Sequence, residues 1–226
     1  MILLAVDTSG WEGSLGLARA DDANRSASLE ILELVALEGG NFSAQLVPQI
    51  AALLAKHEFA QRDIGGFAVA TGPGSFTGLR VGLAAVKGLA EVLEKPIAAV
   101  SRLEAVARAS AEQGRVIAAL DAGRRQTYVG EYDLTPEYAT CVKEQLLSWE
   151  ELVSYAAGRA VTTPDPLLAE ATRQSGVNVL KIEFPNAGAI ARIGWEKLAA
   201  GELADIAALE ANYIRRTDAE ILVYGK

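Results

Sequence analysis

The chain has 226 residues, half of them hydrophobic, which is enough for one large domain or two small ones with a substantial core. The formal net charge of −8 argues against a protein that binds nucleic acid by itself, because such proteins carry a basic surface. The lone Cys141 excludes an intrachain disulfide, and no uncharged hydrophobic run approaches membrane-spanning length, so we expect a cytoplasmic protein with no membrane contact.

The first hundred residues predict a mixed β-sheet with helices packed on it. Hydrophobic runs punctuated by glycines indicate strands, and two longer segments have the periodicity of helices. In chain order we expect strands at 2–7, 14–20 and 29–37, a helix at 43–57, a strand at 67–71, a helix at 76–93 and a strand at 97–100. Three adjoining strands followed by alternating helices and strands are typical of an α/β protein.

The second half of the chain repeats the plan of the opening. Asp7 and Gly16 are nine residues apart, as are Asp121 and Gly130, and each pair spans a strand end, a turn and the next strand. A third strand-like run follows at 140–147, and helices are expected near 149–157, 166–174 and 187–200. We therefore expect two lobes, 1–102 and 103–226, joined by a helical connection near 101–114, with the final segment of the second lobe returning to the first.

The most distinctive segment is GPGSFTGLRVG at residues 72–82, between the strand 67–71 and the helix 76–93. Gly72 and Gly74 permit a tight turn, and Ser75 or Thr77 can cap the helix. Such a turn holds an anion through free N–H groups, or it is a corner with no ligand, and we favour the corner. A phosphate-binding P-loop is excluded, because no Lys-Ser/Thr pair follows the last glycine at the required spacing.

This segment, together with ILLAVDTS at residues 2–9 and ALDAGR at 119–124, resembles the TsaB (YeaZ) family. The resemblance is strongest over residues 2–104 and thins beyond 132. It implies the two-lobed α/β fold shared by actin, sugar kinases and Hsp70 chaperones, with a mixed sheet and packed helices in each lobe. It also implies a non-catalytic scaffold that pairs with the transferase TsaD in bacterial threonylcarbamoyladenosine synthesis, at the tRNA adenosine next to the anticodon. Such a scaffold recruits the ATPase TsaE, reaches tRNA only through the complex, and forms a homodimer when alone.

The two helices of the first lobe carry more hydrophobic surface than one sheet can cover. On the helix 43–57, a large hydrophobic arc adjoins an arc of small residues, and on the helix 76–93 small residues share a side that would admit another backbone. The two helices could simply cover each other, but we expect a helical partner interface, as the family resemblance also implies. The expected interface residues are Leu46, Ile50, Leu53, Leu54, Gly78, Gly82, Ala85 and Leu89, and the adjoining small arc is Ala44, Pro48, Ala51, Ala52 and Ala55.

Few residues of the chain are candidates for chemistry. In kinases of the fold that the resemblance implies, such turns meet phosphate and place the metal, so Asp7, Thr8, Ser9 and Asp121 are candidates for a vestigial nucleotide site. Such side chains can also satisfy their own turns, and we favour that interpretation. The second glycine pair that would hold adenosine is not evident. The alternative function is a free-standing small-molecule kinase that uses Asp7 and Asp121.

Histidine content argues against a metal enzyme. His57 is the single histidine, so the two-histidine metal site that the resemblance associates with TsaD cannot be built. We expect His57 at a helix C-terminus, where its charged form would meet the negative end of the helix dipole. Ser43 is the expected N-cap of the same helix, and Cys141 has no histidine nearby in the sequence to activate it. The expectation is a protein with no enzymatic activity, no cofactor and no intrinsic metal site.

Overall fold

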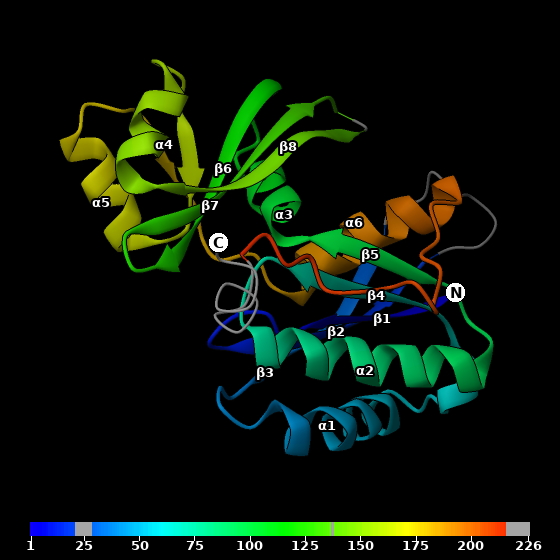
Figure 1. Cartoon of the computed structure of the whole chain (residues 1–226). Coiled ribbons are helices and arrows are strands. Elements are labelled where there is room, and N and C mark those ends of the chain that lie inside the picture. Colours follow the sequence, from blue (N-terminus) through cyan, green and yellow to red (C-terminus); the bar gives the residue numbers. More distant parts are fainter. Residues whose placement is uncertain (21–28, 137, 216–226) are drawn as a thin grey trace. The chain divides into compact units, whose positions relative to one another are not determined.

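The computed structural model describes residues 1–20, 29–136 and 138–215. The chain divides into two compact units (Figure 1). Among the described residues, unit 1 comprises Met1–Ala105 and Pro185–Ala211, and unit 2 comprises Val106–Phe184 and residues 212–215. The segment Pro185–Ala211 thus belongs to unit 1, although it follows the expected second lobe's first residue, 103, in the sequence.

The five-stranded sheet of unit 1 has the order β3-β2-β1-β4-β5. The first three strands form an antiparallel meander, and β4 and β5 add to it in parallel with β1. Every residue of β1 is buried, because β1 is central in the sheet and both faces are covered. The strands are β1 (Ile2–Asp7), β2 (Gly13–Arg19), β3 (Glu30–Leu37), β4 (Ile64–Gly72) and β5 (Ile97–Ser101).

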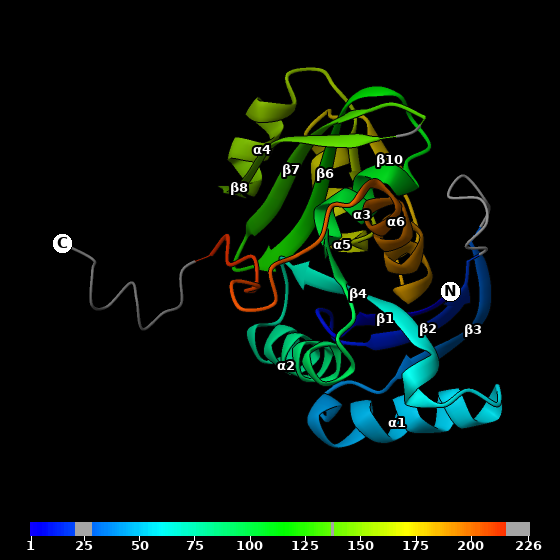
Figure 2. The same ribbon diagram turned by 90° about the vertical axis from the view of Figure 1, so that its right-hand side faces the viewer.

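Helices cover both faces of this sheet (Figure 2). On one face lie α1 (Phe42–Lys56), which follows β3, and α2 (Phe76–Leu93), which follows β4. A short 3-10 turn, η1 (Gln61–Asp63), precedes β4. The opposite face is covered by α6 (Ala187–Ala200), which belongs to the returning segment and packs on β1, β4 and β5. The two hydrophobic cores of unit 1 therefore lie on the two sides of one sheet.

Unit 2 repeats the plan of unit 1, with the sheet order β8-β7-β6-β9-β10. Here too three strands form an antiparallel meander and two short strands add in parallel. Asp7 pairs with Ser14 and Asp121 pairs with Thr127, so the repeat predicted from the sequence is confirmed. The boundary between the units falls within α3 (Arg102–Ala109). The elements that follow in unit 2 are β6 (Gly114–Gly123), β7 (Gln126–Leu134), β8 (Ala139–Ser148), α4 (Trp149–Ala156), β9 (Val161–Thr163), α5 (Pro166–Gln174) and β10 (Val179–Lys181).

The helix ends show which capping expectations hold. Ser75 is the N-cap of α2, and its Oγ accepts a hydrogen bond from the N–H of Gly78 at 3.2 Å, as predicted. His57 is the C-cap of α1, as expected, and its Nε2 lies 2.7 Å from Oε2 of Glu33. The expectation for Ser43 was wrong: α1 begins one residue earlier, so its N-cap is Asn41 and no side chain caps it.

Candidate functional site

The turn between β1 and β2 is closed by its own side chains. Asp7, Thr8 and Ser9 are all buried. Oδ1 of Asp7 accepts hydrogen bonds from the backbone N–H of Ser9 at 2.9 Å and from the Ser9 hydroxyl. The Thr8 hydroxyl donates to the carbonyl of Gly78 in the first turn of α2 at 2.7 Å. The reading that Asp7 satisfies its own turn is confirmed, and Thr8 ties that turn to α2.

The glycines of the distinctive segment make room for this same turn. The N–H of Ser75 donates to the carbonyl of Ser9 at 2.7 Å. A Cβ placed on Gly74 would lie less than 3.0 Å from the backbone of Ser9, and one on Gly78 would lie equally close to the carbonyl oxygen of Thr8. These positions therefore require glycine because two turns of the same unit meet there.

Most of the expected interface residues are buried inside unit 1. Gly82 approaches the Thr8 side chain so closely that a Cβ would lie less than 3.0 Å from its Oγ1. Gly78 and Gly82 thus make room for the β1–β2 turn of the same unit. A partner cannot reach the buried side chains without opening unit 1, and only Ala85 and Leu89 of the eight are half-buried. The six buried residues are Leu46, Ile50, Leu53, Leu54, Gly78 and Gly82.

Apolar residues are exposed on the outward sides of α1 and α2, next to the exposed Arg80 and Glu91 of α2. Val47 is 54% exposed and Val92 is 81% exposed, and a Cβ added to Gly88 would meet nothing within 4 Å. The two helices contact each other, so their outward sides lie on neighbouring elements. We call this surface the α1/α2 face. It consists of Ala44, Val47, Pro48, Ala51, Ala52 and Ala55 on α1 and of Ala84, Gly88 and Val92 on α2. The arc of small residues in α1 was the sequence signal for it.

The second acidic turn, in unit 2, is also held by local hydrogen bonds. Oδ1 of Asp121 accepts from the N–H of Gly123 at 3.1 Å, and the N–H of Asp121 donates to Oδ2 of Asp165 at 2.7 Å. Arg124 and Arg125, at the tip of the β6–β7 hairpin, both have positive φ, at 56° and 57°. Within residues 1–20, 29–136 and 138–215, no three His, Cys, Asp or Glu side chains gather closely enough to hold a metal ion.

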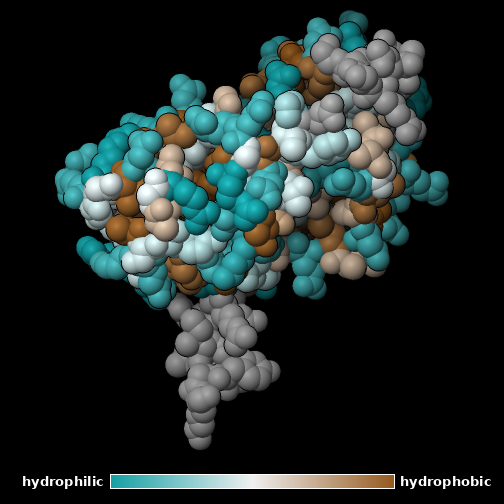
Figure 3. Space-filling view, turned by 90° about the horizontal axis from the view of Figure 1, so that it is seen from above, coloured by the Kyte–Doolittle hydropathy of each residue, from teal (hydrophilic) through white to brown (hydrophobic). Residues whose placement is uncertain are grey.

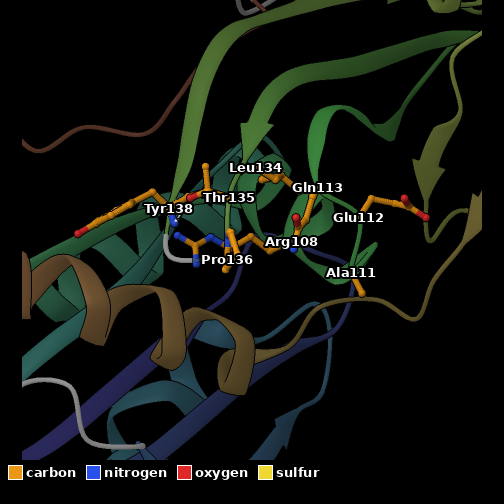
Figure 4. Close-up of a pocket in the computed structure, with 8 residues that line it drawn as sticks. All are labelled: Arg108, Ala111, Glu112, Gln113, Leu134, Thr135, Pro136 and Tyr138. Atoms are coloured by element: carbon orange, nitrogen blue, oxygen red, sulfur yellow. Dashed lines mark hydrogen bonds between the residues drawn. The ribbon is translucent and has the colours of Figure 1, made fainter.

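A pocket of about 220 Å³ lies in unit 2, at the end of β6 opposite to Asp121 (Figure 4). Figure 4 shows Tyr138 and Glu112 pointing away from each other at its two ends, with Arg108 between them. No residue that the sequence proposed for a site lines it. The lining residues are Arg108, Ala111, Glu112, Gln113, Leu134, Thr135, Pro136 and Tyr138. On the face shown in Figure 3, hydrophobic residues form small groups separated by hydrophilic ones.

A buried carboxylate organises the charges of unit 2. Glu131 on β7 accepts hydrogen bonds from the Tyr155 hydroxyl, from Nη1 of Arg159 at 2.6 Å and from Nη1 of Arg115 at 3.1 Å. These bonds, led by that from Tyr155, lower the pKa of Glu131 to about 2, although burial opposes the shift. Glu131 and its partners connect α4 and the segment that follows it to the strands β6 and β7. The role of Glu131 is therefore structural.

Acid should weaken unit 2 through Glu131. Because its pKa is lowered from 4.5 to about 2, its contribution to stability is complete above pH 4.5 and is lost as the pH falls to 2. Glu131→Gln should lower the free energy of unfolding near neutral pH by on the order of 2–3 kcal/mol and should flatten this acid dependence. Urea unfolding at several pH values measures both effects. Glu150→Gln, which removes an exposed ion pair with Arg125, is the control and should change stability by less than about 1 kcal/mol. Equal acid profiles for wild type and Glu131→Gln would contradict the assignment.

Comparison with known proteins identifies the family. The family model described as TsaD, tRNA N6-adenosine threonylcarbamoyltransferase, matches residues 37–221. The tRNA threonylcarbamoyladenosine biosynthesis protein TsaB of Bacillus subtilis is 29% identical over 97% of this chain and 96% of its own length. The Haemophilus influenzae protein of the same name is 30% identical over 68% of this chain and 62% of its own length. The solved structure of YeaZ from Pseudomonas aeruginosa superposes with a TM-score of 0.74 and 28% identity, over 94% of this chain and 99% of that one. The chain belongs to the TsaB (YeaZ) family.

Membership of the TsaB family agrees with the architecture. The two sheets of the same order and the similarity to YeaZ show the two-lobed actin-like fold that the sequence predicted. The matching family model is named for the transferase TsaD, whereas the relatives that align over most of the chain are named TsaB. Among the described residues, no helix is both long enough and hydrophobic enough to cross a bilayer.

Proposed function

We propose that this TsaB-family chain is the non-catalytic subunit of a complex that makes threonylcarbamoyladenosine in tRNA, and that it binds a TsaD-type transferase through the α1/α2 face. The observation that carries the proposal is the exposed hydrophobic surface of α1 and α2, in a chain whose relatives are named for this biosynthesis. Val47, Gly88 and Val92 expose apolar surface that a helix packed only on its own sheet would not need. Small residues along both helices suit close packing against the helices of a partner.

The same surface accounts for the proposed assembly states. In the absence of the transferase, the α1/α2 face of one copy covers that of a second copy and forms a homodimer. The transferase replaces the second copy, and the pair presents a surface to a TsaE-type ATPase. The net charge of −8 supports a division of labour in which the transferase, and not this subunit, contacts the tRNA.

The acidic turns have no chemical role in this proposal. The carboxylate of Asp7 accepts hydrogen bonds from Ser9, and that of Asp121 accepts one from the N–H of Gly123, as turn-forming side chains commonly do. We infer that Asp7, Thr8, Ser9 and Asp121 are the remnants of a nucleotide site whose side chains now hold turns in place. The kinase alternative would need these carboxylates for catalysis.

Reconstitution tests the proposal. A TsaD-type transferase and a TsaE-type ATPase from the same organism, supplied with threonylcarbamoyl-adenylate and unmodified tRNA, should modify the tRNA over many turnovers only when this chain is added. Mass spectrometry of the digested tRNA measures the product. The chain alone should form none, and Asp7→Asn should support modification as well as wild type if it remains folded. ATP turnover by the isolated chain that disappears in Asp7→Asn would instead support the kinase.

A further inference from the structure

Trp11 stands out on the surface of unit 1. Its side chain is 85% exposed, the highest value among the large hydrophobic side chains that the structure describes. The other two tryptophans, Trp149 and Trp195, are half-buried and buried. Large aromatic side chains are enriched among the residues that dominate the binding energy of protein interfaces. The solvent-exposed indole of Trp11 therefore indicates a contact site for another protein.

The backbone that carries Trp11 is fixed from two sides. A Cβ on Gly39, in the turn before α1, would lie less than 3.0 Å from the carbonyl oxygen of Trp11, and 3.5 Å from its Nε1. On the other side, Ser9 accepts the hydrogen bond from Ser75 at the start of α2. The indole is thus presented from a turn that meets the loop before α1 and the start of α2. A fixed backbone leaves only the side-chain torsions of Trp11 to be ordered on binding.

Two exposed glutamates stand near Trp11 in the β2–β3 hairpin, whereas Arg102 lies close to Gly10, with its Nη2 3.6 Å from a Cβ placed on that glycine. Glu12 follows Trp11 in the chain, Glu38 precedes Gly39, and both are exposed. The register of β2 with β3 pairs Gly13 with Leu37, which brings these two glutamates to the same end of the hairpin. An aromatic ring beside carboxylates suits a guanidinium, which stacks on the ring face and pairs with the acids.

The β1–β2 turn lies at the end of unit 1 where both α1 and α2 begin (Figure 1). We propose that Trp11, with Glu12 and Glu38, binds an arginine side chain of the TsaD-type transferase at the edge of the α1/α2 face. This inference rests on the proposed function and adds a specific contact to it.

A second copy of this chain is a poorer occupant. In a pair formed through the α1/α2 faces, the cations of the facing helices are those of α1 and α2 of the other copy. The three cations of these helices are already engaged: Lys56 with Glu33 at 2.6 Å, Arg80 over the ring of Phe76 at 3.7 Å, and Lys87 with the carbonyl of Leu209 at 3.0 Å. Because these cations are engaged within their own chain, we assign the arginine to the transferase.

Fluorine NMR tests the contact directly. The chain is labelled with 5-fluorotryptophan, which gives one resonance for each of its three tryptophans, and Trp11→Phe identifies the resonance of Trp11. Adding the unlabelled transferase should shift the Trp11 resonance. Size-exclusion chromatography of the same mixture shows separately whether a complex has formed. A complex with an unmoved Trp11 resonance would overturn the contact and leave the proposed function standing, whereas absence of any complex would remove the proposed function.

Affinity measurements with variants complete the test. Trp11→Ala should weaken binding of the transferase by at least about 10-fold, and Trp11→Phe by less, because a smaller aromatic ring remains. Glu12→Gln combined with Glu38→Gln should weaken binding and reduce its dependence on salt. Leu167→Ala, which shortens an equally solitary side chain on α5 that is 77% exposed, is the matched control and should bind as wild type. Unchanged affinity of Trp11→Ala, or a Trp11 resonance that moves with concentration in the absence of transferase, would show that the transferase does not occupy this site.

Discussion

Gly82→Arg should abolish cooperative folding of unit 1. A Cβ at this position would lie less than 3.0 Å from Oγ1 of Thr8 and 3.6 Å from a methyl carbon of Val6, so the side chain has no path to water along this side of α2. The substitution adds overpacking and an unpaired buried charge, which together cost several kcal/mol, about the whole stability of an average domain. We expect the variant to be insoluble or to show no cooperative thermal transition by circular dichroism.

Two milder substitutions keep this prediction testable if Gly82→Arg cannot be purified. Gly82→Ala should fold but lose on the order of 1–3 kcal/mol, because Thr8 must move and weaken its hydrogen bond to Gly78. Gly88→Ala adds the same methyl group to the same helix where nothing lies within 4 Å, so it should gain about 0.5–1 kcal/mol from helix propensity. If Gly82→Arg melted like wild type, the glycine side of α2 would be open and our account of it would fail.

The sequence predicted most elements because their hydrophobic periods are long and unambiguous. Residues 76–93, 166–174 and 187–200 form the helices expected from the sequence. The repeated spacing from Asp7 to Gly16 and from Asp121 to Gly130 led to the two sheets of the same order. The strands β9 and β10 were missed, since three residues each are too few to establish an alternation of hydrophobic and polar side chains.

The role of the glycine side of α2 could not be predicted in the same way. A helical wheel shows that Gly78 and Gly82 share a side with Ala85, but not what lies against that side. Their neighbour is Thr8, 70 residues before Gly78 in the chain, and only the fold brings them together. The small residues of α1 differ, because the sheet already covers the opposite side of that helix. The larger hydrophobic arc of α1 packs on the sheet, so the small residues beside that arc are expected to face outward.

Gly88→Arg should leave the protein folded and prevent it from binding the transferase. Gly88 lies between Ala84 and Val92 among the α2 residues of the face, and a Cβ there meets nothing within 4 Å, so an arginine side chain can extend into solvent. In a complex, the same side chain would be enclosed between apolar surfaces, where an unpaired charge costs several kcal/mol and lowers affinity by about 100-fold or more. Thermal melting should match wild type or exceed it, and isothermal titration with the transferase should detect no binding.

An arginine substitution on each helix shows whether the loss of binding comes from an interface formed by both helices or from a local effect at Gly88. Val47→Arg on α1, at a side chain that is 54% exposed, should reproduce the loss of binding and should also give a monomer on a sizing column. Gly88→Ala keeps the face apolar and should bind the transferase almost as well as wild type, which assigns the loss to the charge and not to the loss of glycine. We expect Gly82→Arg to unfold the protein, and we expect Gly88→Arg to leave it folded but unable to bind the transferase. The two arginines therefore distinguish the side of α2 that packs on the β1–β2 turn from the side that contacts the partner. Retained binding by folded Gly88→Arg and Val47→Arg would place the transferase elsewhere on the molecule.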